Sequence, residues 1–546
     1  MSPGLDHDWH SVFANPKPNV GERTKTRLLI VLCALWLVFG LTGHAPWRPD
    51  ELQSISIIKH LVNGGDWLIP VMAGEATLKN PPLYYLSAAL FAKLFSSILP
   101  LHDAARLVTS LWTTLTLLFV GMTGRELWGT GTGRQAALIF ISSVGLVFSA
   151  HMLSPEVAGL CAYAAAFYAL SLAPRKPLRA GVILGMAAGI GFLSKGLVNL
   201  EIILTTALLL PLLFNHWRRS AYLQTLALML VVATPWVGPW LILLQQKAPD
   251  LFNTWLTDSR AITNRTLFVT KALTWYSWPA LPLAVWTLWR MRPSHTSIQL
   301  ALLFFLVQFV LLGTSISNNH IYLLPFLLPL TLLATPAVDK LQRSFASALN
   351  WFGVMVFGVL AAFVWTGWVA MMTDMPARLA VRVHVLSSGY VPHFNRVSVA
   401  LAAALTVLWL AVVFKSHRSN RAAITDWAVG MTMVWGLVMT LWLPWLDAAK
   451  TYQPVFTAMH KAMPNRFACI TSRDVGPSQL AALDYYANLH VQRFELVQNL
   501  LSCDLYLIAD DRDRARIEPG QDWKLLWEGK RPSDRHESFR LFQRTN

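Results

Sequence analysis

Long apolar segments recur along most of this chain, and they constrain its fold more than any other feature. Fourteen such segments lie between residues 27 and 446. Their lengths are close to the roughly 20 residues that an α-helix needs to cross the hydrocarbon core of a bilayer. Only 14% of all residues are charged, against about 25% in soluble proteins. The sequence therefore predicts a mainly α-helical, polytopic membrane protein.

The charged residues between these segments predict which of them cross the membrane. If all fourteen crossed from a cytoplasmic N-terminus, basic loops such as that with Arg125 and Arg134 would face outward, against the positive-inside rule. Segment 83–99 is short and follows two prolines, so we expect it to lie along the membrane interface with Tyr84 and Tyr85 at headgroup level. Thirteen spans then remain: 27–44, 105–124, 135–152, 157–172, 179–194, 197–214, 221–243, 272–289, 298–315, 321–337, 349–372, 397–414 and 426–446.

This topology places every arginine-rich short loop in the cytoplasm. The formal net charge is +16, yet residues 447–546 hold 14 Lys+Arg and 13 Asp+Glu, so the excess lies in the short loops. Such loops favour anionic membrane lipids as partners, and the pattern excludes nucleic acid. We expect a monomer in the cell inner membrane, with these parts outside the cytoplasm: 45–104, the 153–156 turn, 245–271, the 316–320 turn, 373–396 and the C-terminal tail.

The chain is expected to have three parts: a cytoplasmic segment (1–26), a transmembrane domain (27–446) whose first periplasmic loop (45–104) carries interfacial helices, and a small periplasmic α/β domain (447–546). The apolar pattern of the tail predicts strands, one helix and a terminal strand pair, at 467–471 and 505–509, at 477–489, and at 523–527 and 538–542.

Four cysteines are present, and none has metal-ligand spacing. Cys33 and Cys161 lie in apolar segments, where packing is their expected role. Cys469 and Cys503 flank predicted strands in a domain placed in an oxidising compartment, so we expect them to form a disulfide; two free buried thiols are the alternative.

The first extracytoplasmic loop contains the most informative polar residues. Asp50 and Glu51 follow the first span at the start of a helical pattern. At the membrane surface a carboxylate can act as a general base on an acceptor hydroxyl, or bind a divalent cation at a phosphate. The alternative is that both acids only stabilise a helix N-terminus. Lys79 is the best-placed cation of this loop.

Two short turns on the same side of the membrane add further charges. Glu156 begins a span directly after Pro155, where it either serves the helix N-terminus or takes part in chemistry. Lys195 lies between two spans; it either neutralises a phosphate or extends to the interface from a helix end. Arg260 is a further phosphate candidate or a solvated loop residue. His320 and Tyr322 lie where a span returns into the membrane. For both residues we expect a structural hydrogen-bonding role in preference to a catalytic one.

Four motifs in this order resemble those of one known superfamily. The chain is similar to the aminoarabinose transferase and protein O-mannosyltransferase superfamily, integral-membrane glycosyltransferases of the C-type fold, from about residue 27 to 340 and more weakly beyond. The motifs are Pro49-Asp50-Glu51 with Gly65-Asp66-Trp67 and Pro70, Lys79-Asn80-Pro81-Pro82-Leu83-Tyr84-Tyr85, Leu193-Ser194-Lys195-Gly196, and His320-Ile321-Tyr322-Leu323-Leu324-Pro325.

The resemblance implies a polyprenyl-phosphate donor without a nucleotide sugar, thirteen spans and a periplasmic C-terminal domain. By position, Asp50 corresponds to the first-loop acid, Glu156 to the second acid and Lys195 to the phosphate-binding lysine. The pattern of the aminoarabinose transferases differs at Lys79-Asn80, Gln53 and Asn318-Asn319-His320, so the resemblance implies the fold and donor class more than the sugar.

These features predict a glycosyltransferase that moves a sugar from a polyprenyl-phosphate-linked donor to a periplasmic acceptor such as lipid A or another envelope glycan or protein. In this reading Asp50 and Glu156 are catalytic, and Lys195, Arg260 and Lys79 bind the donor phosphate. Further substrate contacts are expected from Glu51, His320, Tyr322, Tyr84 and Tyr85. The cofactor stays open, with a divalent cation at Asp50 and Glu156 as one option. The alternatives are a transporter or flippase of a lipid-linked sugar and a non-catalytic envelope-assembly protein.

Overall fold

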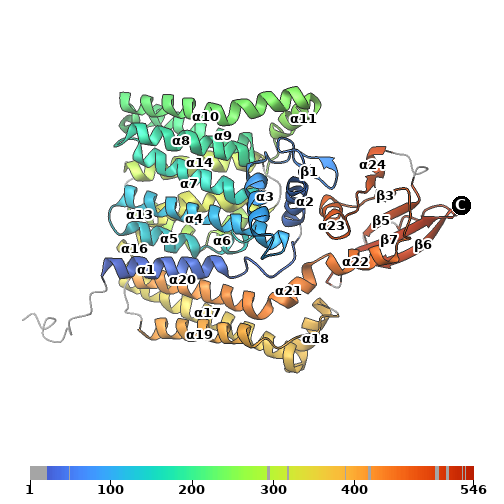
Figure 1. The fold of residues 1–546 in the computed structure, drawn as a ribbon. Helices are drawn as coiled ribbons and strands as arrows, with labels where there is room; N and C mark the ends of the chain where they lie inside the picture. The colour runs from blue at the N-terminus through green and yellow to red at the C-terminus, as the bar shows by residue number, and fades with distance from the viewer. Residues whose placement is uncertain are drawn as a thin grey trace, which may run out of the picture.

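The computed structural model describes residues 21–546, apart from Arg48, 292–294, 316–318, Ser388, 416–419, 498–502, 512–515, Pro532, Arg535 and Asn546. Most of the N-terminal segment 1–26 and the predicted cytoplasmic cations Arg292 and Arg418 therefore lie outside the described residues. Two parts are visible: a bundle of long, roughly parallel helices, and a small α/β unit beyond one end of that bundle (Figure 1).

Each of the thirteen predicted spans is occupied by a helix or by helices in series. Within the described ranges, nine helical segments are long and apolar enough to cross a membrane. The bundle comprises α1 (Glu22–Val38), α4 (Leu101–Trp128), α5 (Thr132–Ile141), α6 (Val144–Ser149), α7 (Pro155–Leu172), α8 (Pro177–Lys195), α9 (Leu197–Leu213), α10 (Ser220–Lys247), α12 (Thr266–Tyr276), α13 (Ala280–Arg290), α14 (Thr296–Ser315), η2 (His320–Phe326), α15 (Leu327–Ala334), α17 (Arg343–Thr373), α19 (Arg396–Lys415), α20 (Asn420–Leu437), η3 (Val438–Trp442) and α21 (Leu443–Lys450).

Two of the predicted spans, 135–152 and 272–289, are interrupted. The first divides into α5 and α6, where the hydroxyls of Ser142 and Ser143 hydrogen-bond to carbonyls one turn back. Such bonds compete with regular helix geometry. The second divides into α12 and α13 at Pro279, which has no N–H for a helical hydrogen bond. The backbone N–H of Val144 bonds to the Trp278 carbonyl at 3.1 Å, so the two breaks are joined.

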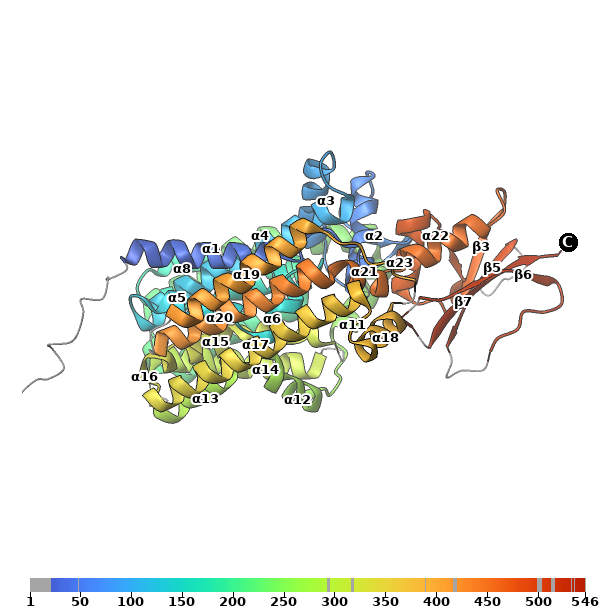
Figure 2. The same ribbon diagram turned by 90° about the horizontal axis from the view of Figure 1, so that it is seen from below.

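Short helices gather at the end of the bundle that faces the α/β unit (Figures 1 and 2). The N-terminal end of α1 and the short helix α16 lie at the opposite end. The loops predicted to lie outside the cytoplasm therefore share one end of the bundle with the tail. Their elements are α2 (Asp50–Val62), the hairpin β1 (Val71–Met72) and β2 (Glu75–Ala76), α3 (Leu83–Phe95), α11 (Pro249–Ser259) and α18 (Ala377–Leu386); the remaining short helices are η1 (Asn215–Trp217) and α16 (Ala337–Lys340).

Segment 83–99 forms α3, whose 13 residues extend about 20 Å, too short for the roughly 30 Å hydrocarbon core. This supports the prediction that the segment does not span. The expected place of its tyrosines was wrong. Tyr84 and Tyr85 are 0% and 4% exposed and pack between α2, α4 and the start of α7, with the Tyr84 hydroxyl 2.9 Å from Thr109 Oγ1. Hydropathy alone does not distinguish a lipid headgroup layer from a protein interior.

The tail forms a five-stranded sheet with strand order β4-β3-β5-β7-β6, in which β3 pairs in parallel with β4 and β5, and β7 pairs antiparallel with β5 and β6. The predicted helix and terminal strand pair are confirmed, and so is the disulfide between Cys469 and Cys503. The elements are α22 (Gln453–Ala462), β3 (Ile470–Arg473), α23 (Pro477–Ala487), β4 (Gln492–Arg493), α24 (Phe494–Val497), β5 (Leu505–Asp511), β6 (Trp523–Gly529) and β7 (Glu537–Arg544).

Candidate functional site

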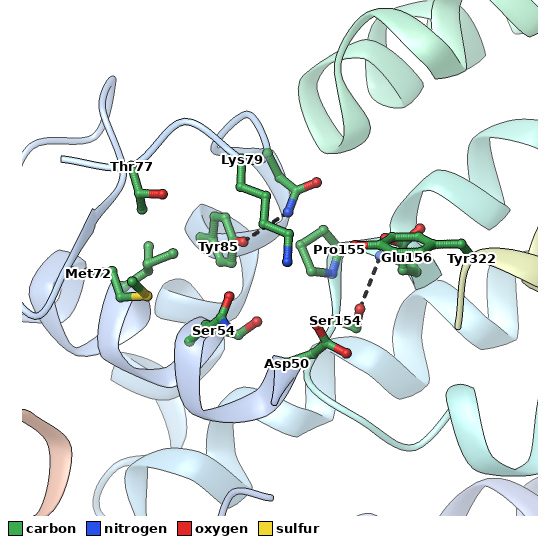
Figure 3. A pocket seen from close by; sticks show the side chains of 13 residues that line it. Asp50, Ser54, Met72, Thr77, Lys79, Tyr85, Ser154, Pro155, Glu156 and Tyr322 are labelled. Carbon is green, nitrogen blue, oxygen red and sulfur yellow. Dashed lines mark hydrogen bonds between the residues drawn. The ribbon is translucent and has the colours of Figure 1, made fainter. Parts of the chain in front are cut away.

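A pocket opens at the end of the bundle that carries α2 and α3; its empty space, open solvent at the mouth included, is about 450 Å³. It lies between the first turns of α2, the segment after the β1–β2 hairpin, the start of α7 and η2 (Figure 3). Five residues predicted from the sequence to form the site line this pocket together: Asp50, Lys79, Tyr85, Glu156 and Tyr322. The remaining lining residues are Gln53, Ser54, Ile57, Met72, Thr77, Asn80, Ser154 and Pro155.

Asp50 is the first residue of α2, directly after Pro49. An acid in the first turn lies at the positive end of the helix dipole, where a negative side chain is favourable. The carboxylate also accepts a hydrogen bond of 3.1 Å from the Asn319 side chain, at the start of η2. Asp50 therefore presents a hydrogen-bond acceptor to the pocket, and two separate segments, α2 and the start of η2, fix its position.

Glu156 and Lys195 form a buried ion pair with a direct hydrogen bond. Their side chains are 9% and 14% exposed, and Lys195 also donates to Asn80 Oδ1 at 2.8 Å. Gly159, one turn after Glu156, allows this approach, because a Cβ there would lie 2.7 Å from Lys195 Cγ. The lysine ammonium lies 5.3 Å from the centre of the Tyr322 ring, a cation–π arrangement.

Lys79 is exposed, and its ammonium reaches into the pocket between Tyr85 and Pro155 (Figure 3). Over the described part of the chain, no hydrogen bond or ion pair engages this ammonium. Lys195 already has an anionic partner, so Lys79 is the cation with open donor capacity for an anion that enters the pocket.

Glu51, by contrast, is directed away from the pocket and is fully buried. Its carboxylate accepts from Arg106 Nε at 2.9 Å and from the backbone N–H groups of Trp47 and Leu153 at 2.9 and 3.0 Å. Burial alone would raise the pKa of Glu51, but the Arg106 guanidinium, the nearby His44 ring and these hydrogen bonds lower it to about 2. The sequence-based expectation of a substrate contact finds no support in this geometry, because the carboxylate has its partners inside the protein.

Other residues named from the sequence also lie outside the pocket lining. Arg260 is exposed at the end of α11. His320 is exposed and its ring lies 5.2 and 5.3 Å from the rings of Phe268 and Trp275. Tyr84 is fully buried and does not line the pocket. The structure therefore brings these three residues to the same end of the molecule without placing them at the site.

Several residues that the sequence reasoning did not single out contribute to the site. Asn80 links two site residues, because its amide donates to the Tyr85 hydroxyl at 3.4 Å and accepts from Lys195. Its position beside Lys79 in the first-loop motif was the available signal. In the described ranges, no group of three or more His, Cys, Asp or Glu side chains is arranged to hold a metal ion. Asp50 and Glu156 are the two acids of the pocket lining.

Comparisons with known proteins show what this chain is similar to. A family model described as dolichyl-phosphate-mannose-protein mannosyltransferase matches residues 79–242. The undecaprenyl phosphate-alpha-4-amino-4-deoxy-L-arabinose arabinosyl transferase of Yersinia enterocolitica is 25% identical over 444 residues, 76% of each chain. The apo crystal structure of ArnT from Cupriavidus metallidurans matches with a TM-score of 0.66 and 16% identity, over 95% of this chain and 98% of that one.

The crystal structure of the same protein bound to undecaprenyl phosphate matches with a TM-score of 0.66, 15% identity and the same coverage. These matches confirm the resemblance to the aminoarabinose transferase-like glycosyltransferases that the motifs indicated. The likeness to the two solved structures shows the fold, an integral-membrane glycosyltransferase fold of the C type.

Proposed function

We propose that this protein is a glycosyltransferase that moves a sugar from a polyprenyl-phosphate donor to an acceptor hydroxyl in the cell envelope, such as one on lipid A. The observation that carries this proposal is the pocket at one end of the helix bundle that Asp50, Lys79 and Glu156 line, with Lys195 paired to Glu156. The undecaprenyl-phosphate arabinosyl transferase relative and the shared fold support the donor class.

The proposed reaction is a single group transfer. The acceptor hydroxyl oxygen attacks the anomeric carbon of the sugar, the bond from that carbon to the phosphate oxygen breaks, and polyprenyl phosphate leaves with the bonding electrons. Asp50 takes the proton of the attacking hydroxyl, a role that suits a carboxylate held in place at the pocket by Asn319. Because phosphate is already a good leaving group, orientation and charge stabilisation supply most of the acceleration.

In this proposal two lysines stabilise the phosphate in different ways. Lys79 donates directly to the phosphate oxygens, since it has open donor capacity at the pocket. Lys195 adds positive potential from within the wall, where Glu156 and Asn80 hold it. Glu156 is then a positioning residue for Lys195, and a pentosyl or hexosyl group occupies the space beside Asp50.

The cellular placement follows from the same proposal. Polyprenyl-phosphate sugars that serve envelope acceptors present their headgroups at the outer face of the inner membrane, which places the pocket and the α/β unit of residues 447–546 in the periplasm. The short basic loops at the opposite end of the bundle then face the cytoplasm, in agreement with the positive-inside rule.

A single-turnover assay on purified protein tests the proposal. Saturating polyprenyl-phosphate sugar and a lipid A acceptor are mixed with the wild type and with Asp50→Asn, which keeps size and loses the base. We expect a rate about a hundred- to ten-thousand-fold lower for Asp50→Asn, because a lost general base typically costs that much. Asp250→Asn, an exposed acid in the first turn of α11, is the matched control and should react at the wild-type rate.

A second pair of variants separates donor binding from chemistry. Lys79→Ala should raise the donor KM roughly tenfold or more, whereas Lys93→Ala, an exposed lysine on α3 outside the pocket, should leave it unchanged. Transfer of the lipid-linked sugar across vesicle membranes without a glycosylated product would favour the flippase alternative. Near-normal turnover by Asp50→Asn would reject the role assigned to that residue.

A further inference from the structure

Helix α2 contacts two different parts of the molecule with two different faces. Asp50, Gln53, Ser54 and Ile57 follow one another at helical spacing and line the pocket. The face formed by Leu52, Ser56 and Lys59 turns the other way and contacts the α/β unit. Leu52 is fully buried within the hydrophobic core that the α/β unit builds around its sheet. One helix therefore belongs both to the pocket wall and to the core of the C-terminal unit.

Ser478, in the first turn of α23, contacts two residues close to Asp50 in the chain. Its hydroxyl donates to the carbonyl of Pro49 at 3.3 Å and accepts from the Gln53 side chain at 3.2 Å. Pro49 directly precedes Asp50, and Gln53 lines the pocket. A serine of the C-terminal unit thus fixes both the backbone before the proposed base and a neighbouring pocket side chain.

Asp484, at the other end of α23, secures the rest of α2. Its carboxylate accepts from Ser56 Oγ at 2.6 Å and from Lys59 Nζ at 3.0 Å. The Asp484 side chain is buried, and that of Lys59 is nearly so. Ser56 Oγ in turn accepts from the backbone N–H of Ala73 at 2.9 Å, beside the pocket residue Met72. The Asp484 cluster therefore connects α23 to two segments of the pocket wall.

A 13-residue helix is marginal by itself, so its packing partners decide where it lies. The pocket face of α2 is open, and α3 and α23 cover much of the remainder. From these contacts we infer that the C-terminal α/β unit is part of the catalytic framework, and that Ser478 and Asp484 are positioning residues that hold Asp50 through α2. This inference rests on the proposed function for the role of Asp50, but not for the contacts themselves.

Three variants test the inference in the full-length protein. Ser478→Ala and Asp484→Ala should lower kcat roughly ten- to a hundred-fold, because a displacement of about 1 Å at a reacting group can cost a hundred-fold. The donor KM should change less than twofold, since the phosphate is assigned to Lys79, which lies on another segment. Asp484→Asn keeps an acceptor for Ser56 and should recover most of the lost kcat.

Gln479→Ala is the matched control. Gln479 neighbours Ser478 but bonds to Glu537 and Tyr452, inside the C-terminal unit. Its loss should lower the thermal unfolding temperature of the protein and leave kcat unchanged. Equal kcat losses in Gln479→Ala and Ser478→Ala, or wild-type kcat in both Ser478→Ala and Asp484→Ala, would overturn the inference.

Hydrogen–deuterium exchange gives a readout that does not depend on catalysis. Amides of 50–62 should exchange at least tenfold faster in Ser478→Ala and Asp484→Ala than in the wild type or in Gln479→Ala. If the wild type transfers no sugar, the proposed function fails. The exchange pattern still tests whether Ser478 and Asp484 hold α2 in place. Unchanged exchange in both α23 variants would show that the C-terminal unit does not hold α2.

Discussion

The buried pair of Glu51 and Arg106 allows a quantitative prediction. Both side chains are 0% exposed, and they share two hydrogen bonds, from Arg106 Nε at 2.9 Å and from Nη2 at 3.3 Å. The same guanidinium donates to the carbonyls of His44 and Ala45, so it also ties the segment after α1 to the bundle. Glu51→Gln removes the negative charge and turns one acceptor oxygen into a donor that faces other donors.

The expected cost follows from burial. Removal of one partner of a buried ion pair destabilises a protein by about 3–5 kcal/mol, because an uncompensated charge stays inside. Asp103 still accepts from Arg106 Nη1 at 2.8 Å, so part of the charge remains compensated. We therefore expect Glu51→Gln to lower the free energy of unfolding by about 3 kcal/mol, the lower end of that range.

Denaturant titration of the purified protein in micelles measures this cost. Glu75→Gln is the matched control, since Glu75 pairs with Arg493 at 3.5 Å on a partly exposed surface and should cost less than about 1 kcal/mol. The double variant Glu51→Gln/Arg106→Met should lose less than the sum of the two single variants, because the stranded charge is gone. Stability of Glu51→Gln within about 0.5 kcal/mol of the wild type would refute the reasoning.

Three further predictions follow from other features. Since folding lowers the pKa of Glu51 from 4.5 to about 2, its ionised form stabilises the folded state above pH 4.5, and this stability should disappear as the pH falls from 4.5 towards 2; an acid titration of Glu51→Gln should lack that component. The disulfide between Cys469 and Cys503 joins residues 34 positions apart, so reduction should destabilise the C-terminal unit by about 3–4 kcal/mol in a denaturant titration, and an unchanged midpoint would contradict this. Cysteines introduced between positions 121 and 134 should react with impermeant reagents from the cytoplasm, and labelling from the periplasm would overturn the thirteen-span topology.

The sequence was sufficient to predict the membrane fold because span length and loop charge are local properties. It also predicted the α/β tail, whose strands and helix follow from short-range apolar patterns. The interruption at Pro279 and the one at Ser142 were missed, although proline and paired serines were visible, since hydropathy averages over such positions. Tyr84 was placed at the lipid interface because an aromatic pair beside an apolar helix has the same pattern in a protein interior.

The candidate site was predictable in its members and not in its connections. Asp50, Glu156 and Lys195 were found from motif and topology; in the structure Asp50 and Glu156 line the pocket, and Lys195 pairs with Glu156. The ion pair of Glu156 with Lys195 depends on Gly159, which allows α7 and α8 to come into contact. The distance between two helices cannot be predicted from the sequence of either helix alone. Arg106 looked like an ordinary residue near the start of a span; only its three-dimensional partners identify it as the centre of a buried network.

Mass spectrometry of the envelope glycolipids tests the central claim most directly. Cells that produce the wild-type protein, the Asp50→Asn variant or no protein are compared by the masses of lipid A and other envelope glycans. We predict that one acceptor carries an added pentose- or hexose-sized mass with the wild type alone, while polyprenyl-phosphate sugar accumulates in the other two strains. Identical glycolipid and glycan profiles in all three strains would contradict the claim that this protein transfers a sugar to an envelope acceptor.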